Sequence, residues 1–322
     1  MRVLLAGASG TLARALLPQL VASGHDVIGL GRRPGSVDRI RALGGTPVVA
    51  DVLDREALLR ALAGHRADAV IHELTALQKP PIRYGAMTAT NVLRTTGTEN
   101  LLAAAAQLGA TRFLTQSIVF GYAYRRRYAG PVDESTEFGH AEDLPTDATV
   151  VALARNEDLV RSAPGVDGIA LRYGLFYGLD AGTVTRMLRR RGLPASRATG
   201  AVPFIHHEDA AAATVAALER GIPGAAYNIT DGTRQTWAGY LDDAARAFGT
   251  PAPLRMPIWM LRAVAPYAAE LMTRMDLEVT SAKAHEELGW APRFTTTAEG
   301  WAHEAGRQSA VARRAKSRRM PE

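Results

Sequence analysis

The feature that most constrains this chain is a glycine turn close to its start. An apolar run over residues 2–6 leads into the sequence GASGTLA at 7–13, and a helical pattern follows. Gly7 allows a tight turn, and Gly10 lets the backbone approach a pyrophosphate at the positive end of a helix. A strand, turn and helix in this order predict dinucleotide binding. The contacts that we expect from this turn come from Gly7, Ser9, Gly10, Thr11 and Leu12.

Short strands alternate with helical stretches over the first half of the chain. We expect strands at 2–6, 26–30, 47–50, 69–72, 112–116 and 168–171. Helical patterns lie between them, at 11–22, 36–43, 55–63, 87–108 and 148–163. Such alternation is typical of βαβ units with right-handed crossovers. The predicted fold class is therefore α/β, with a Rossmann-type doubly wound parallel sheet in the strand order 3-2-1-4-5-6.

The second half has a different rhythm. After Gly178, helical patterns separated by Gly/Pro links occupy 183–191, 208–219, 237–248, 258–275 and 281–288. We expect residues 1–178, joined by parts of 204–230, to form the dinucleotide-binding domain. Residues 179–303 should form mainly a smaller, mostly helical substrate lobe over the carboxyl edge of the sheet, where open α/β folds bind ligands. We expect the remaining residues, 304–322, to be a basic, disordered tail.

Charge and composition restrict the partners. The net charge is +6, but the segment from Gly306 to Glu322 holds six basic residues and one acid, so residues 1–305 are nearly neutral. This distribution argues against nucleic-acid binding. The chain has no cysteine and no apolar run long enough to cross a bilayer, so we expect a cytoplasmic protein without membrane contact. We expect it to be a monomer or a homodimer.

The end of the second predicted strand indicates which cofactor is bound. NAD enzymes place Asp or Glu there for the ribose 2′-hydroxyl, whereas this chain reads LGRR over residues 30–33. Arg32 and Arg33 could pair with a 2′-phosphate, although in a chain with only three lysines they could also be ordinary solvated arginines. We therefore expect NADPH. Asp51 and Val52, after the third strand, suit contacts to the adenine, although Asp51 could instead begin the next helix.

Several further segments occur in an informative order. They are NVLRTT at 91–96, LRYGLFYG at 171–178, FIHHED at 204–209, YNI at 227–229 and ELGWAP at 287–292. Together with the glycine turn, they resemble the extended epimerase/dehydratase branch of the short-chain dehydrogenase/reductase superfamily, over the chain to about residue 303. The resemblance implies a nicotinamide cofactor and a small-molecule substrate. The further cofactor contacts that we expect come from Leu74, Thr75, Asn91 and Phe176.

One motif of that family is missing. Its members usually carry a Tyr-x-x-x-Lys pair, in which the tyrosine exchanges a proton with the substrate and the lysine lowers its pKa. The corresponding helix here reads TVVALARNE over residues 149–157, which places Thr149 at the tyrosine position and Leu153 at the lysine position. No lysine elsewhere follows a tyrosine by four residues. The usual acid/base pair is therefore absent.

Other polar and aromatic residues are candidates for the substrate site. Ser117, in LTQSIVFG at 114–121, is the predicted catalytic residue because its hydroxyl could bind a substrate carbonyl; local backbone could equally satisfy it. The residues predicted to bind substrate are Ile118, Tyr122, Tyr124 and His206. The tyrosines could instead line an apolar pocket, and His206 could cap a helix. His206 and His207 have no third ligand at metal spacing, so we expect no metal.

Three classes of function remain open. The favoured one is an atypical NADPH-dependent ketoreductase that reduces a ketone on a polycyclic aromatic, polyketide-type substrate, with the proton supplied by substrate or water. In its overall sequence, the chain resembles the atypical ketoreductases of angucyclinone tailoring. The second is a redox-neutral epimerase, dehydratase or cyclase on the same fold. The third is an NADP(H)-sensing regulator without chemistry, against which stands the retained lobe with its apolar segment at 257–261.

Overall fold

The computed structural model describes residues 1–77, 81–122, 124, 127–196 and 200–317, with the backbone alone for 312–317. Its centre is a parallel sheet in the order β3-β2-β1-β4-β5-β6-β9. The strands are β1 Arg2–Ala6, β2 Asp26–Gly31, β3 Thr46–Val49, β4 Ala69–His72, β5 Arg112–Ile118, β6 Asp167–Tyr173 and β9 Ala226–Ile229. The predicted class and the order 3-2-1-4-5-6 are confirmed, and the second half adds β9 at the edge.

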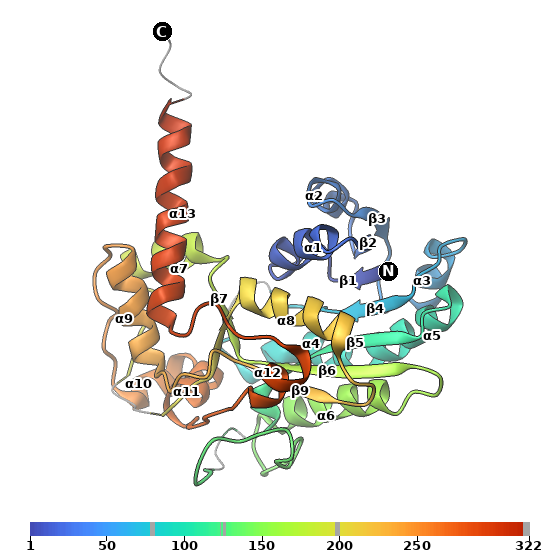
Figure 1. Ribbon diagram of the computed structural model, residues 1–322. Helices are drawn as coiled ribbons and strands as arrows, with labels where there is room; N and C mark the ends of the chain where they lie inside the picture. The colour runs from blue at the N-terminus through green and yellow to red at the C-terminus, as the bar shows by residue number, and fades with distance from the viewer. Residues whose placement is uncertain (78–80, 123, 125–126, 197–199, 318–322) are drawn as a thin grey trace.

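The sheet is buried on both faces, which explains its continuous apolar strands. Alternate side chains of β1 enter two different cores: Val3 and Leu5 pack on one face, and Leu4 and Ala6 on the other. Figure 1 shows helices α1 and α8 on the first face and α3, α5 and α6 on the second. Their bounds are α1 Ala13–Ala22, α8 His207–Arg220, α3 Arg55–Ala61, α5 Thr98–Leu108 and α6 Asp147–Arg161.

The helical stretch expected at 87–108 is continuous but not uniform. It consists of α4 Thr88–Val92, a π-helical turn η3 at Leu93–Gly97, and α5. Shorter pieces link the other elements: η1 Pro34–Ser36, α2 Val37–Ala42, η2 Tyr84–Met87 and η4 Val119–Gly121. A π turn widens the helix locally and occurs frequently at functional sites.

Most of the remaining elements gather in a mostly helical part beside the large sheet. They are β7 Leu175–Tyr177 and β8 Phe204–His206, which pair in parallel, and helices α7 Ala181–Arg189, α9 Trp237–Ala247, α10 Ile258–Val264, α11 Pro266–Thr273 and α13 Thr297–Ser317. Helix α12 Ala282–Leu288 packs instead on α8 and β9. Stacked and edge-on rings form the core of the mostly helical part, with Phe204 and Tyr240 4.5 Å apart between centroids. The helix expected at 258–275 divides at Pro266, which starts α11 because proline has no N–H to continue α10.

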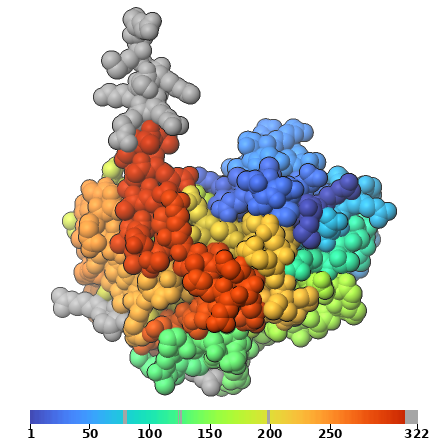
Figure 2. Space-filling view, in the orientation of Figure 1, coloured from blue at the N-terminus to red at the C-terminus, as the bar shows by residue number. Residues whose placement is uncertain are grey.

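The expectation of a disordered tail from residue 304 is wrong for 304–317, because α13 is helical as far as Ser317. Trp301 and Glu304 are buried against the body, and Arg307 forms an ion pair with Glu208 of α8. The many charged residues of this segment led to the prediction of disorder, although the start of the helix packs on the body. Figure 1 shows the later turns of α13 clear of the body, and Figure 2 shows its earlier turns packed against the molecule. Residues 318–322 lie outside the described residues. No helix of the described chain is both long and apolar enough for a transmembrane span.

Candidate cofactor and substrate site

The glycine turn at the end of β1 has the shape that a dinucleotide phosphate needs. Gly7 has φ of +96°, and a Cβ there would lie 2.7 Å from the carbonyl oxygen of Glu73. The N–H of Gly10 donates to the carbonyl of Gly7 over 2.8 Å, which closes the turn. No acidic residue occupies the first turn of α1. The N–H groups at this helix end are therefore suited to an anion. Ser9, Gly10 and Thr11 are accessible, whereas the side chain of Leu12 is buried.

The basic residues after β2 lie beside this turn. Arg32 and Arg33 are both exposed. A side chain at Gly31 would collide with the hydroxyl of Ser36, so the local packing leaves no room for a carboxylate there. Arg39 of α2 donates to the carbonyl oxygen of Ser9 over 3.0 Å. Sequence reasoning missed Arg39; its position one turn into the helix that follows the two arginines is the signal that could have identified it.

The other expected cofactor contacts lie at the carboxyl ends of neighbouring strands. Asp51, half-buried after β3, accepts a hydrogen bond from the N–H of Leu53 over 3.0 Å, and Val52 is buried. Leu74 is half-buried and Thr75 exposed, directly after β4. Because β4 pairs with β1, these residues lie at the same edge as the glycine turn.

Asn91 and Phe176 are both engaged within the protein. The Asn91 amide donates to the carbonyl of Ala148 and the hydroxyl of Thr149, each over 3.2 Å, and thereby joins α4 to α6. Phe176 is half-buried and stacks on His207, with ring centroids 5.4 Å apart. The contact predicted for Asn91 would require its amide to exchange these partners, while Phe176 keeps an accessible face.

Ser117 is engaged within the protein, and its catalytic role stays a prediction. The side chain is fully buried, and its hydroxyl donates to Oε1 of Glu157 over 2.6 Å. Glu157 in turn holds Arg172 in a buried ion pair of 2.7 Å. Because side chains alternate along a strand, Ser117 faces α6, and Gln116 and Ile118 point to the opposite side. Ser117 is thus a structural partner of a buried carboxylate, and Ile118 stays half-buried at the strand end.

Tyr122 belongs to the same buried network, and its predicted substrate contact stays a prediction. Its hydroxyl donates to Oδ1 of Asn228 over 2.7 Å and accepts from Arg172 over 2.9 Å. Burial raises the pKa of Tyr122 to about 12, despite the nearby guanidinium. A hydroxyl with both partners filled and such a pKa is a poor proton donor at neutral pH.

His206 caps a helix, and its predicted substrate contact stays a prediction. The residue is fully buried, and its Nδ1 accepts from the N–H of Glu208 at the start of α8. Its ring packs on Phe294, with centroids 4.5 Å apart, and its Nε2 lies 3.5 Å from Glu304. The capping alternative weighed from the sequence is the one that this geometry supports.

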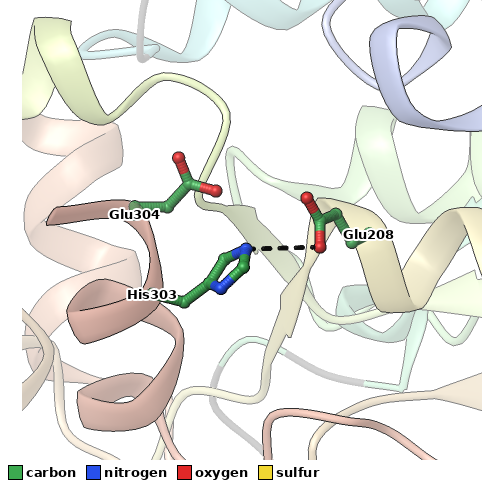
Figure 3. A group of neighbouring side chains, drawn as sticks. All are labelled: Glu208, His303 and Glu304. Carbon is green, nitrogen blue, oxygen red and sulfur yellow. Dashed lines mark ion pairs between the residues drawn. The ribbon is translucent and has the colours of Figure 1, made fainter. Parts of the chain in front are cut away.

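Glu208, His303 and Glu304 come close enough to be considered as metal ligands (Figure 3). His303 lies 3.6 Å from Glu208, as the dashed line in Figure 3 shows. Both carboxylates, however, are paired with the guanidinium of Arg307, and Arg293 lies 3.7 Å from Glu208. These cations already compensate the acidic charge, so we interpret the cluster as an ion-pair network that fastens α13 to α8. The absence of a metal stays a prediction.

A buried guanidinium that sequence reasoning missed lies at the ends of β4 and β5. Arg94, in the π turn η3, is 8% exposed, and its Nη1 donates to Oδ1 of Asn91 over 3.1 Å. It interacts electrostatically with Tyr124, Tyr267 and His72. Tyr124, predicted to bind substrate, is itself buried and shares a 2.8 Å hydrogen bond with the hydroxyl of Tyr267 from α11. The π turn could not be foreseen, because a sequence with a regular helical pattern gives no signal for it.

Glu73, directly after β4, is a second buried titratable group at this edge. Its Oε1 accepts from the hydroxyl of Tyr173 over 3.1 Å, and its Oε2 has no hydrogen-bond partner among the described residues. Burial raises the pKa of Glu73 to about 8, opposed by the Tyr173 hydrogen bond. A neutral carboxylic acid at pH 7 therefore lies next to the turn that the cofactor phosphates would occupy.

On α6, the positions that correspond to the tyrosine and lysine of the Tyr-x-x-x-Lys pair hold no titratable side chain. Thr149 is 4% exposed and accepts a hydrogen bond from Asn91, and Leu153 is fully buried. Leucine can neither carry a positive charge nor bind a ribose hydroxyl. Helix α6 packs beside β5 and β6. The candidate substrate residues start at Ile118, the last residue of β5.

The fold and the site define a nicotinamide-dinucleotide-binding protein of the extended Rossmann class. Residues 3–230 match the NAD dependent epimerase/dehydratase family, and the chain belongs to that family. It is 36% identical to a 3-diazoavenalumate denitrifying reductase of a Streptomyces species, across 94% of this chain and all of that protein. It is 28% identical to the 4-hydroxy-2-methyl-3-oxo-4-farnesyl-3,4-dihydroquinoline-1-oxide ketoreductase of Stigmatella aurantiaca, across 92% of this chain and 93% of that protein.

Solved structures agree with this assignment of the fold. UDP-glucose 4-epimerase of Bifidobacterium longum, in complex with NAD⁺ and UDP, superposes with a TM-score of 0.75 at 19% identity. The superposition covers 97% of this chain and 99% of the epimerase. The fold therefore agrees with the epimerases, while the relatives named as reductases support an oxidoreductase within the family.

Proposed function

We propose that this protein is an NADPH-dependent reductase of aromatic substrates that works without a Tyr-x-x-x-Lys pair. The observation that carries the proposal is that the chain combines a dinucleotide turn at Gly7 with Thr149 and Leu153 on α6. A chain that keeps the cofactor turn but holds a buried leucine in place of the lysine can position a cofactor and a substrate. It cannot perform the family's usual proton transfer.

NADPH is favoured over NADH by the residues around the turn. The turn itself suits the pyrophosphate, and Arg32, Arg33 and Arg39 are the cations available for a 2′-phosphate. No carboxylate can stand at Gly31 to bind an unmodified ribose. When bound, NADPH would supply a hydride. The residues of the chain hold the cofactor, orient the substrate under the helical lobe and exclude water.

The primary substrate class is an aromatic ketone with a neighbouring phenol. The hydroxyls of Ser117 and Tyr122 are both occupied within the buried network, so they offer no proton to a developing alkoxide. A phenol beside the ketone already donates a hydrogen bond to its oxygen and could supply that proton from within the substrate, or water could supply it. Such a substrate requires orientation from the protein and little acid catalysis.

A second substrate class, an aryl diazo compound, is favoured by the relative that is named a denitrifying reductase of a diazo acid. Replacement of N₂ by hydrogen on an aryl diazonium carbon takes up one hydride, breaks the C–N bond and releases N₂. No oxyanion forms, so this reaction needs no proton. The absence of the Tyr-x-x-x-Lys pair would then not slow the reaction.

The test uses NADPH carrying deuterium at C4, in both stereochemical forms, with two panels of substrates. One panel holds polycyclic aromatic ketones with an adjacent phenol, together with their methyl ethers; the other holds aryl diazonium compounds. We expect one deuterium per product from one stereochemical form only. If a ketone is the substrate, its methyl ether should bind but react much more slowly. Isomerisation without consumption of NADPH, or tight NADPH binding with no turnover of either panel, would overturn the proposal in favour of a redox-neutral enzyme or a sensor.

A further inference from the structure

Arg94 lies where the carboxyl edge of the sheet meets the helical lobe. The charges that suit the cofactor lie at the glycine turn after β1 and at the arginines after β2. Arg94 instead lies beside His72, the last residue of β4, and beside Tyr124 in the segment after β5. Tyr267 approaches it from α11 of the lobe. Its surroundings thus belong to the junction of the sheet edge and the lobe, where substrates of open α/β folds are enclosed.

Among the described residues, no carboxylate balances the charge of Arg94. A guanidinium has several N–H donors, and the hydrogen bond recorded for Arg94 among the described residues goes to the neutral amide of Asn91. Its electrostatic neighbours, Tyr124 and Tyr267, are neutral phenols, and no carboxylate of the described chain forms an ion pair with it. The other arginine that is buried among the described residues, Arg172, is paired with Glu157. A buried, unpaired charge is costly, so a fold retains it where a ligand completes the pair.

The groups around this guanidinium are aromatic. Tyr124 lies 6.1 Å from Tyr267 and 5.8 Å from Phe120, measured between ring centroids. Tyr84 meets Tyr267 edge-on, with centroids 5.9 Å apart. Such walls pack well against a planar conjugated molecule, and a guanidinium binds a carboxylate with two parallel hydrogen bonds.

We propose that Arg94 binds a carboxylate of the substrate, so that the substrate is an aromatic or conjugated carboxylic acid. This inference rests on the proposed function, since it names the substrate class of that same site. Arg94 is a binding and specificity residue in this account. It selects anionic substrates and holds the ring against Tyr124 and Tyr267.

The test measures binding of matched acids and amides to the full chain saturated with NADP⁺, by calorimetry. The probes are benzoate, cinnamate and 2-naphthoate with their primary amides, which have the same shape without the charge. We expect at least one acid to bind at least about tenfold more tightly than its amide, as charge-assisted hydrogen bonds imply. Arg94→Met should abolish this preference, and Arg94→Lys should restore part of it. Arg155→Met, on the exposed side of α6, is the matched control and should keep it.

A second readout separates a ligand-binding role from a structural one. If Arg94 is held for a ligand, Arg94→Met removes an uncompensated buried charge and should leave the melting temperature of the ligand-free protein equal or higher. A structural arginine would instead lower it on substitution. A lower melting temperature for Arg94→Met would therefore overturn the inference.

Three other results would also overturn it: no acid of the panel binds better than its amide, the preference survives Arg94→Met, or Arg94→Met weakens NADP⁺ binding tenfold or more. The last result would assign Arg94 to the cofactor. Because these are binding measurements, they do not depend on turnover. Failure of the proposed reductase activity would appear separately, as an absence of deuterium transfer.

Discussion

Glu73 offers the sharpest physical prediction, because its burial links stability to pH. The residue is 8% exposed, with one carboxyl oxygen bonded to Tyr173 and the other without a partner among the described residues. The pKa is raised from 4.5 to about 8, chiefly by burial. The folded protein therefore holds a proton that the unfolded chain loses above about pH 4.5. The free energy of unfolding should therefore fall as the pH rises from about 4.5 to 8. Above pH 8 the whole contribution of the Glu73 proton should be lost.

The displacement of the pKa from 4.5 to about 8 corresponds to roughly 5 kcal/mol at most. Glu73→Gln keeps the shape and removes the titration, so the variant should gain stability relative to the parent as pH rises. We expect the gain between pH 5.5 and 8.5 to exceed about 1.4 kcal/mol, the value of one pKa unit. Urea unfolding at several pH values measures this difference. Glu56→Gln, an exposed carboxylate on α3, is the control and should show no such trend. A stability difference that stays constant with pH would refute the buried, protonated state of Glu73.

Three further predictions concern the cofactor, the buried network and α13. Replacing Arg32 and Arg33 together with alanine should remove most of the preference for NADPH over NADH, measured by calorimetry; equal affinities in the parent protein would contradict the assignment. Ser117→Ala should lower the free energy of unfolding by about 1.5–3 kcal/mol, since it leaves a buried carboxylate short of a donor, yet reduce kcat far less than the roughly 10²–10⁴-fold loss of a general acid. Truncation after Val311 should keep kcat within about twofold, roughly 0.4 kcal/mol, because the anchoring residues precede it; a tenfold loss would show that the distal helix completes the site.

The sequence predicted the elements that rest on local rules. Alternating apolar runs placed the strands, and the glycine turn with its helix defined the edge of the sheet where the cofactor residues gather. These features depend on backbone conformation and on periodicity, both of which a single chain displays directly.

Side-chain orientation was the part that the sequence could not provide. Ser117 and Gln116 are neighbours on one strand, and which of them faces the substrate depends on register against α6. Arg94 is one arginine among many in a lysine-poor chain, and only the fold shows that it is buried with no carboxylate of the described residues paired to it. The first turns of α13 were missed because a count of charges ignores that Trp301 and Glu304 share one helical face.

The central claim, reduction without a protein acid, is tested most directly by the pH dependence of kcat at saturating NADPH deuterated at C4. Where hydride transfer limits the rate, as a primary isotope effect would show, we predict a flat profile between about pH 6 and 9, because no protein group titrates in the proton-transfer step. A fall in kcat near pH 8 that disappears in Glu73→Gln would contradict the claim, since it would identify the buried carboxylic acid as the proton donor.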